Sequence, residues 1–407
     1  LEQIKEADLE LTIAAADGKV LEIELEAKEV SEDDLMVAVD LALAECAKQI
    51  AAQNELVKLV GKPKREVALV APDPELVEEI DAKLGDEIAK AIREPEMSES
   101  EKAILDLKDK WAAQLAEEYP ERVAELDEIL EKLLKKNVRK MLLDEGSRAD
   151  GRAIDQIRPL ECQVGLLPRV HGSGLFMRGQ TQVLTTLTLG SLDDAQIVDN
   201  LEEDTEKRFM HFYNFPPYAT GEVRPIRGAG RREVGHGALA EKALRAVIPQ
   251  TEDFPYALLM TSECLESNGS TSMASTCGCT LALLDAGVKI KAPVAGISIG
   301  LISDETRKVL LTDIQALEDF YGDMDFKVTG TRNGVTAIQV DTKLHGLSRD
   351  VVEGALEKAK AARMTILDKF AEVIPEPRET LSEYAPRVFV VEIHPDKIGD
   401  IIGPGGK

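Results

Sequence analysis

Apolar and polar residues alternate at both ends of this 407-residue chain, and a helix-rich stretch separates the two ends. Residues 8–26 alternate around an Asp-Gly turn, and from Arg148 onward short alternating runs are broken by glycine turns. Period-two alternation predicts strands that bury one face. Residues 61–146 are instead rich in Glu, Lys, Ala and Leu at helical spacing, with prolines between the runs. We therefore predict an α+β fold, in which an all-helical linker domain precedes a mixed β-sheet with helices packed on one side.

A strand followed by a capped helix occurs twice in the sequence. Ser31 precedes three acidic residues and starts one predicted helix, and Ser348 starts a second one. When the two units are aligned on these serines, Ile23 corresponds to Val340. A strand followed by a capped helix is common, so the two units can resemble each other by chance. A true repeat would mean that residues 1–60 are the last third of a first copy, and that an N-terminal domain has been cut from the chain.

Charge and cysteine content limit the function classes. The formal net charge of −26 repels nucleic acid in bulk, but residues 224–232 carry four arginines and no acid, so a polyanion can bind locally. The five cysteines have no repeated spacing, which disfavours a zinc site and favours free thiols in a reducing cytosol. No apolar stretch reaches membrane length, and no signal peptide is recognisable. We expect a cytoplasmic protein without membrane contact.

The stretch Asp319–Lys327 gathers acidic residues around one lysine. Read as an extended strand, it places Asp323, Asp325 and Lys327 on one face. Asp319 lies just before a Tyr-Gly turn, close enough to fold back beside Asp325. Carboxylates gathered beside a lysine form a hard-oxygen site for a divalent ion, with a cation at hand for a phosphate. A hairpin with ordinary surface charges is the alternative, and this stretch alone does not decide between them.

A second stretch, residues 266–275, follows a predicted strand and opens an apolar helix. Ser270, Thr271 and Ser272 place hydroxyls and free amides at the helix N-terminus, where the helix dipole favours an anion. Simple helix capping is the alternative. Three small hydroxyl residues behind Asn-Gly exceed what a cap requires, so the pattern favours an anion site. It lacks the lysine motif of a nucleotide P-loop.

Arg231, Arg232 and His236 open another predicted helix. Paired arginines there oppose the helix dipole unless an anion lies nearby, and guanidinium groups suit phosphate geometry. His236 lies between two glycines and can contact a phosphate or simply cap the helix. Combined with the two previous stretches, these residues predict a site that holds a free oxyanion next to a metal-bound phosphodiester. If the bound oxyanion is itself the nucleophile, the reaction is phosphorolysis rather than hydrolysis.

The C-terminal residues predict a nucleic-acid-binding loop. Residues 387–393 read as a strand, and a short helical stretch at 395–402 follows. An Ile-Ile-Gly-x-x-Gly sequence after such a strand is typical of the phosphate-gripping loop of a KH domain. The predicted RNA-binding residues are Gly403, Gly406 and Lys407.

Taken in order, these motifs resemble those of the polynucleotide phosphorylase family, densely over residues 148–345. The matching stretches are Arg148-Ala-Asp-Gly-Arg152, Leu167-Pro-Arg-Val-His-Gly-Ser173, Arg178-Gly-Gln-Thr-Gln182, Phe212-Tyr-Asn-Phe-Pro-Pro217, Arg231-Arg-Glu-Val-Gly-His-Gly237, Ser267-Asn-Gly-Ser-Thr-Ser-Met-Ala-Ser275 and Gly322-Asp-Met-Asp-Phe-Lys327. The linker and the two ends of the chain resemble the family in the order of their predicted elements more than in particular motifs. The resemblance implies a remnant of a first ribonuclease PH-like domain at 1–60, the helical linker at 61–146, a second, catalytic ribonuclease PH-like domain at 147–385 and the start of a KH domain at 386–407.

The resemblance also implies an activity. Members of the family degrade single-stranded RNA from the 3′ end with inorganic phosphate, release nucleoside diphosphates, and run in reverse as template-independent polymerases. They form homotrimeric rings, and RNA-degrading assemblies are candidate partners. Carried over by position, Asp319 and Asp325 hold Mg²⁺ or Mn²⁺ beside Lys327. The remaining carried-over residues contact the phosphate co-substrate: Arg231, Arg232, His236, Ser270, Thr271 and Ser272.

Two other functions fit parts of the pattern. A non-catalytic ring subunit that binds RNA as a scaffold would not need all of these chemical features. A hydrolytic metal nuclease would use the acidic residues but leave the anion site unexplained. The sequence departs from the commonest family pattern at Arg224-Pro-Ile-Arg227 and at Gln315-Ala-Leu317, and neither change removes a residue with an assigned role.

Overall fold

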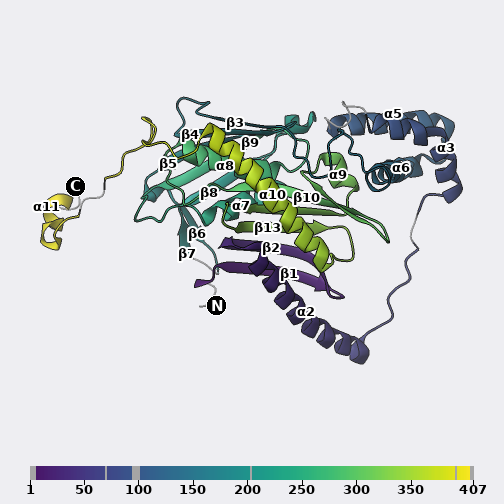
Figure 1. The fold of residues 1–407 in the computed structure, drawn as a ribbon, viewed down its shortest axis with the longest axis horizontal. Coiled ribbons are helices and arrows are strands. Elements are labelled where there is room, and N and C mark those ends of the chain that lie inside the picture. The colour runs from purple at the N-terminus through teal and green to yellow at the C-terminus, as the bar shows by residue number, and fades with distance from the viewer. Residues whose placement is uncertain (1–5, 69–70, 94–100, 202–203, 390–391, 404–407) are drawn as a thin grey trace.

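The computed structural model describes residues 6–68, 71–93, 101–201, 204–389 and 392–403. It contains two large sheets (Figure 1). The first is fully antiparallel, with the order β1 (Leu9–Ala16), β2 (Lys19–Val30), β13 (Val335–Thr342), β12 (Met324–Gly330), β10 (Ala295–Ser303) and β11 (Lys308–Thr312). The second has the order β3 (Leu160–Val164), β4 (Gly172–Arg178), β5 (Thr181–Gly190), β9 (Ala257–Glu266) and β8 (Phe209–Asn214), with β8 and β9 parallel. The short hairpin of β6 (Gln196–Asp199) and β7 (Asp204–Lys207) is separate.

Helix α8 (Thr271–Asp285) lies at the centre of the fold. All of its residues are buried, and it packs against β4 and β5 of one sheet and β10 of the other. No charged residue precedes Asp285 in it, and a helix that is uncharged on every side belongs in a core. Gly174 and Gly278 let β4 approach the helix closely, because a Cβ on Gly174 would lie 2.6 Å from the Gly278 carbonyl oxygen. The expectation of one sheet with helices on one side was therefore too simple, although the α+β class is confirmed.

The strand-and-helix repeat is present in three dimensions. The β1–β2 hairpin leads into α2 (Glu32–Val60), and the β12–β13 hairpin leads into α10 (Arg349–Val373). Strands β2 and β13 are neighbours in the first sheet, and the aligned residues Ile23 and Val340 stand directly opposite each other. This is the arrangement that two copies related by a local twofold axis produce. Ser31 caps α2 by accepting a hydrogen bond from the amide of Asp34, and Ser348 occupies the same position on α10.

The linker forms a small helical unit with its own core. Its helices are α3 (Pro74–Ala91), α5 (Glu101–Glu118) and α6 (Val123–Leu143). Trp111 is fully buried in it. The same apolar cluster continues into Leu317 and Tyr321 of α9 (Ala316–Tyr321), so the linker packs against the helix that carries Asp319. Arg139 of α6 adds an ion pair of 2.7 Å with Asp323.

Helix α7 (Arg231–Arg245) covers one end of the first sheet, where it packs against β13 and β2 as well as β8 and α8. Its Lys242 and Arg245 pair with Glu24 and Glu26 of β2. The residues near the N-terminus of the chain are thereby tied to the helix that opens with the predicted phosphate-binding arginines.

The predicted strand at 387–393 was wrong for the residues described there: 387–389 and 392–393 are not in strand conformation. A strand needs a neighbour to accept and donate its backbone hydrogen bonds, and none lies beside this segment among the described residues. The segment leads away from the two sheets (Figure 1) to a 3₁₀ turn at Pro395–Lys397 and α11 (Ile398–Ile402). Gly403 has a left-handed φ of 73°. The predicted RNA-binding residues Gly406 and Lys407 lie outside the described residues.

No helix in the described part of the chain is both long enough and apolar enough to cross a bilayer.

Candidate active site

A cavity of about 320 Å³ opens where the first turns of α7 and α8 meet α9 and the start of β12. The residues that line it are Arg232, His236, Ser267, Gly269, Ser270, Thr271, Ser272, Ala316, Asp319, Phe320, Asp325, Lys327 and Asp341. Eight of the nine residues predicted for the catalytic and phosphate sites are therefore brought to one place. The ninth, Arg231, is exposed at the start of α7 and is not among the lining residues.

The loop before α8 presents hydroxyl groups to this cavity. Gly269 and Ser270 have left-handed φ angles of 89° and 52°, which turn the chain sharply into the helix. The Oγ atoms of Ser270 and Ser272 are buried and have no hydrogen-bond partner within the described part of the chain. Buried hydroxyls without partners are costly, and the first amides of a helix also lack intrahelical acceptors. The loop therefore fits an oxyanion that accepts hydrogen bonds from both kinds of donor.

A buried cluster of arginine and aspartate side chains contacts the backbone of this loop. Arg178 donates hydrogen bonds to the carbonyl oxygens of Gly269 (3.2 Å) and Ser270 (3.1 Å), and its Nε lies 2.6 Å from Oδ1 of Asp313. Arg158 donates to the same carboxylate at 2.8 Å. Burial acts to raise the pKa of Asp313, but the positive charges of Arg158 and Arg178 outweigh it and lower that pKa. The cluster fixes the loop because breaking one ion pair would leave a charge unpaired in the core.

The two predicted metal-binding aspartates approach from different elements. Asp319 lies on α9, and Asp325 lies on β12, where its Oδ2 is 2.7 Å from Nζ of Lys327. Oδ1 of Asp325 is buried without a hydrogen-bond partner among the described residues. Burial and the charge of Asp325 raise the pKa of Asp319 to about 6. Burial works to lower the pKa of Lys327, but the adjacent carboxylates, Asp325 above all, raise it.

One local prediction about this stretch was wrong, namely that Asp323 shares a face with Asp325 and Lys327. Asp319 lies on α9, just before the Tyr321-Gly322 turn, and Glu318 caps this helix by accepting a hydrogen bond from the Gln315 amide. Asp323 precedes β12 and is not among the residues that line the cavity. It pairs with Arg139 of the linker and accepts a hydrogen bond from the Ser303 amide at 2.7 Å. Its charge docks the linker domain.

The first two turns of α7 contribute Arg232 and His236. Burial, followed by the charges of Lys327 and Arg232, lowers the pKa of His236 to about 3, so its imidazole is neutral near pH 7. Its Nδ1 is buried without a partner in the described structure, which leaves it able to hydrogen-bond a ligand. The Arg232 guanidinium lies 4.7 Å from the centre of the Phe215 ring, a cation–π contact that orients it.

These residues fit a divalent cation and a phosphate together. No group of three or more His, Cys, Asp or Glu side chains within the described ranges forms a closed ligand set. Mg²⁺ is typically held by only one or two carboxylates, with water and substrate phosphate oxygens as its other ligands. Asp319 and Asp325 supply two carboxylates, and the unpartnered Oδ1 of Asp325 is an available ligand atom.

Sequence reasoning missed several residues that shape the site. Tyr213 donates or accepts a hydrogen bond of 2.6 Å with Thr271, and its ring packs against His236 at 5.3 Å. Tyr213 and Phe215 lie in the stretch Phe212–Pro217, which resembles the family motif but carries no local sign that these rings contact His236 and Arg232. Nothing in the local sequence predicts the role of Asp313, because a single acidic residue directly after a strand is typical of an ordinary turn.

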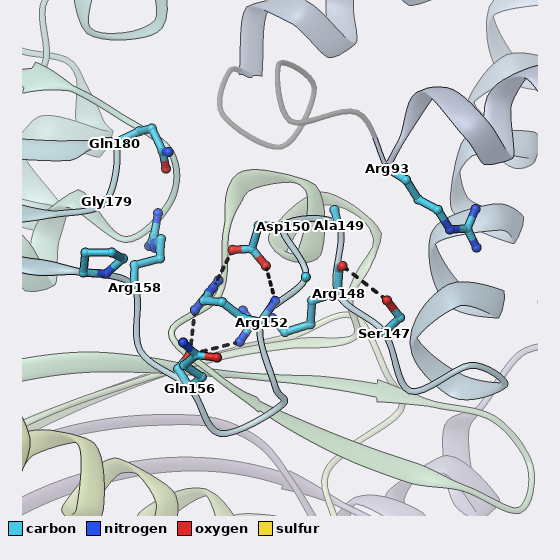
Figure 2. A pocket seen from close by; sticks show the side chains of 12 residues that line it. Arg93, Ser147, Arg148, Ala149, Asp150, Arg152, Gln156, Arg158, Gly179 and Gln180 are labelled. Atoms are coloured by element: carbon cyan, nitrogen blue, oxygen red, sulfur yellow. Dashed lines mark hydrogen bonds and ion pairs between the residues drawn. The ribbon is translucent and has the colours of Figure 1, made fainter.

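A larger cavity, of about 630 Å³, lies near the linker and contains Arg148, Arg152 and Arg158 (Figure 2). These arginines already donate hydrogen bonds to acceptors within the protein. Arg148 donates to Glu318 at 2.7 Å, and Arg152 donates to the Gln156 carbonyl oxygen at 2.7 Å. The matched motif Arg148–Arg152 therefore braces α9 and the loop around Asp313 rather than presenting free cations to a ligand.

Family models match three consecutive segments of the chain. Residues 75–153 match the RNA binding domain of polyribonucleotide nucleotidyltransferase. Residues 156–289 and 292–362 match domains 1 and 2 of the 3′ exoribonuclease family. Curated relatives named polyribonucleotide nucleotidyltransferase align with all of the chain, at 49% identity in Halothermothrix orenii and 50% in Desulfitobacterium hafniense. The chain belongs to the polyribonucleotide nucleotidyltransferase family.

The chain spans 59% and 57% of the length of these two family members. A solved structure described as an Archaeoglobus fulgidus exosome with RNA bound to the active site superposes with a TM-score of 0.50. That chain is 16% identical, and the match covers 60% of this chain and 99% of the other. At this identity the likeness concerns the fold, and it agrees with the family's ribonuclease PH-like sheets.

Proposed function

We propose that the protein is a phosphate-dependent 3′–5′ exoribonuclease that releases nucleoside diphosphates from single-stranded RNA and can run in reverse as a template-independent polymerase. One observation carries the proposal. The unpartnered hydroxyls of Ser270 and Ser272 and the unpartnered carboxylate oxygen of Asp325 line the same small cavity. An oxyanion site and a cation site that share one cavity suit the attack of phosphate on a phosphodiester.

Inorganic phosphate would be held by the α8 N-terminus, with Arg232 and neutral His236 on its other side. One phosphate oxygen attacks the phosphorus of the terminal phosphodiester, and the bond from that phosphorus to the 3′ oxygen of the preceding nucleotide breaks. The 3′ oxygen takes up a proton, and the former terminal nucleotide leaves as a diphosphate. Mg²⁺ or Mn²⁺ held by Asp319 and Asp325 would neutralise the charge that develops on the phosphoryl oxygens. Lys327 adds a fixed positive charge beside them.

The assembly expected for this function extends the proposal. It includes a homotrimeric ring through which single-stranded RNA reaches the site, an RNA-gripping loop that begins at Gly403, a cytoplasmic location, and association with RNA-degrading assemblies. The basic segment at 224–232, with four arginines in an otherwise acidic chain, supports a local path for a polyanion.

The test uses 3′-labelled RNA with Mg²⁺, with and without phosphate, for this chain and for a polypeptide of the relatives' length that contains it. The expected products are nucleoside diphosphates, formed only when phosphate is present. Monophosphate products would show a hydrolytic nuclease instead, and RNA binding without turnover at any phosphate concentration would show a scaffold subunit. Asp325→Asn should abolish turnover and leave RNA binding within about twofold, since it removes one ligand of the cation and none of the phosphate donors.

A further inference from the structure

One row of polar side chains crosses three neighbouring strands and ends at the active site. Gln339 of β13 stands opposite Lys327 of β12 on one side and opposite Glu24 of β2 on the other. Residues directly opposite in an antiparallel pair point to the same face of the sheet, so these three side chains form a continuous line. The line begins in the segment at 1–60 and ends at a residue of the cavity.

The three side chains are joined by hydrogen bonds with a fixed direction. Lys327 Nζ donates to Gln339 Oε1 at 3.3 Å, and Gln339 Nε2 donates to Glu24 Oε1 at 2.8 Å. Glu24 Oε2 lies 3.5 Å from Nζ of Lys242 on α7. An ammonium group can only donate and a carboxylate can only accept. The amide of Gln339 therefore satisfies both neighbours in one orientation only, with its nitrogen toward Glu24 and its oxygen toward Lys327.

We propose that Glu24 and Gln339 are positioning residues for the active-site lysine. Without the Glu24 carboxylate, only Lys327 itself holds the Gln339 amide in its orientation, so Oε1 becomes a less firmly fixed acceptor for Nζ. With Glu24 present, Nζ has two fixed acceptors, Gln339 on one side and Asp325 at 2.7 Å on the other. The strand contributed by the segment at 1–60 is then part of the catalytic apparatus. The kinetic consequence of this inference rests on the proposed function, but its structural content does not.

The chain offers a matched control. Glu26 lies two residues from Glu24 on the same strand and also pairs with a cation of α7, Arg245, at 2.9 Å. Glu26 stands opposite Ala337, which cannot relay a hydrogen bond to the site. Glu24→Gln and Glu26→Gln each remove one strand carboxylate that pairs with α7, but only the first replaces the acceptor-only group beside Gln339 with an amide that can also donate. Gln339→Met breaks both links at nearly constant volume.

Two measurements test the proposal. In the first, an amine-reactive acyl reagent labels the protein, and mass spectrometry reports modification of Lys327 relative to Lys369 on α10. We expect Glu24→Gln and Gln339→Met to change the labelling rate of Lys327 about threefold or more, and Glu26→Gln to leave it as in the wild type. In the second, phosphorolysis kinetics should show kcat about three- to tenfold lower for the first two variants, with KM for RNA unchanged, and no change for Glu26→Gln.

The outcomes separate the two hypotheses. If wild-type protein shows no phosphorolysis, the proposed function fails, and the labelling experiment still decides whether the row holds Lys327. If phosphorolysis occurs but the Glu24 and Glu26 variants behave alike in both measurements, the positioning role is overturned. Equal loss of kcat in both glutamate variants, with unchanged labelling, would show that they act only by anchoring α7. Agreement between Gln339→Met and Glu24→Gln guards against a folding defect in either one.

Discussion

Substituting either of the two aspartates in the cavity should change stability, and in opposite directions. Asp319 is held as a carboxylate at a cost, because burial and its neighbour Asp325 raise its pKa from 3.8 to about 6. A rise of that size corresponds to roughly 3 kcal/mol of lost stability above pH 6. The loss is absent below pH 3.8, where the group is protonated in both folded and unfolded protein, and develops as the pH rises toward 6. Asp319→Asn removes it and should stabilise the metal-free protein by about 2–3 kcal/mol at pH 7.5, but much less at pH 4.5.

Asp325→Asn should have the opposite sign at pH 7.5. It leaves the Lys327 ammonium, whose side chain is only 10% exposed, without its closest counter-charge. Relief of the repulsion with Asp319 offsets part of this loss, so we expect destabilisation of roughly 1–3 kcal/mol. Urea unfolding in EDTA, followed by circular dichroism at both pH values, measures both effects. Equal stability of wild type and Asp319→Asn at pH 7.5, or stabilisation by both substitutions, would refute this account of the site.

Further predictions concern the loop and the imidazole. Gly269→Ala should destabilise the protein by about 2–4 kcal/mol and weaken phosphate binding, because the new Cβ would lie 2.8 Å from the Ile314 carbonyl oxygen and the backbone at this position is left-handed. Gly18 is also left-handed but has open space around it, so Gly18→Ala should cost only about 1 kcal/mol of backbone strain. Thermal unfolding of the two variants measures the difference. Ser272→Ala should reduce phosphate affinity about tenfold by calorimetry without loss of stability, whereas Ser298→Ala, which removes another buried and unpartnered hydroxyl, should leave that affinity intact. The His236 ring signals should not titrate between pH 5 and 8 in NMR spectra, since burial keeps the imidazole neutral; a midpoint near 6.5 would contradict this.

The structure also explains why the linker and the N-terminal segment accompany the catalytic sheets. The linker core extends to Leu317 and Tyr321 on either side of Asp319, so packing of α6 sets the position of one cation ligand. The segment at 1–60 reaches Lys327 through Glu24 and Gln339. Both regions lie outside the cavity, yet each contacts a direct neighbour of a lining residue: the linker contacts Leu317 beside Ala316, and the segment at 1–60 contacts Gln339 beside Lys327.

The sequence by itself determined the features that depend on neighbours along the chain. Ser31 as a helix cap, the hydroxyl run before α8 and the strand that carries Asp325 follow from local spacing and the chemistry of single turns. Alternation states which residues share a face, but it does not state which strand or helix lies beside that face.

Only the tertiary structure therefore decided what each charged residue does. It assigned Asp323 to the linker and Asp325 to the cavity, although the two lie two residues apart. It also buried Asp313 among arginines and joined Glu24 to Lys327 through a strand more than three hundred residues away in sequence. Such pairings depend on the register of distant strands, because whether a carboxylate is a ligand, a docking group or a buried counter-ion is set by the charges that the fold brings within a few ångströms of it.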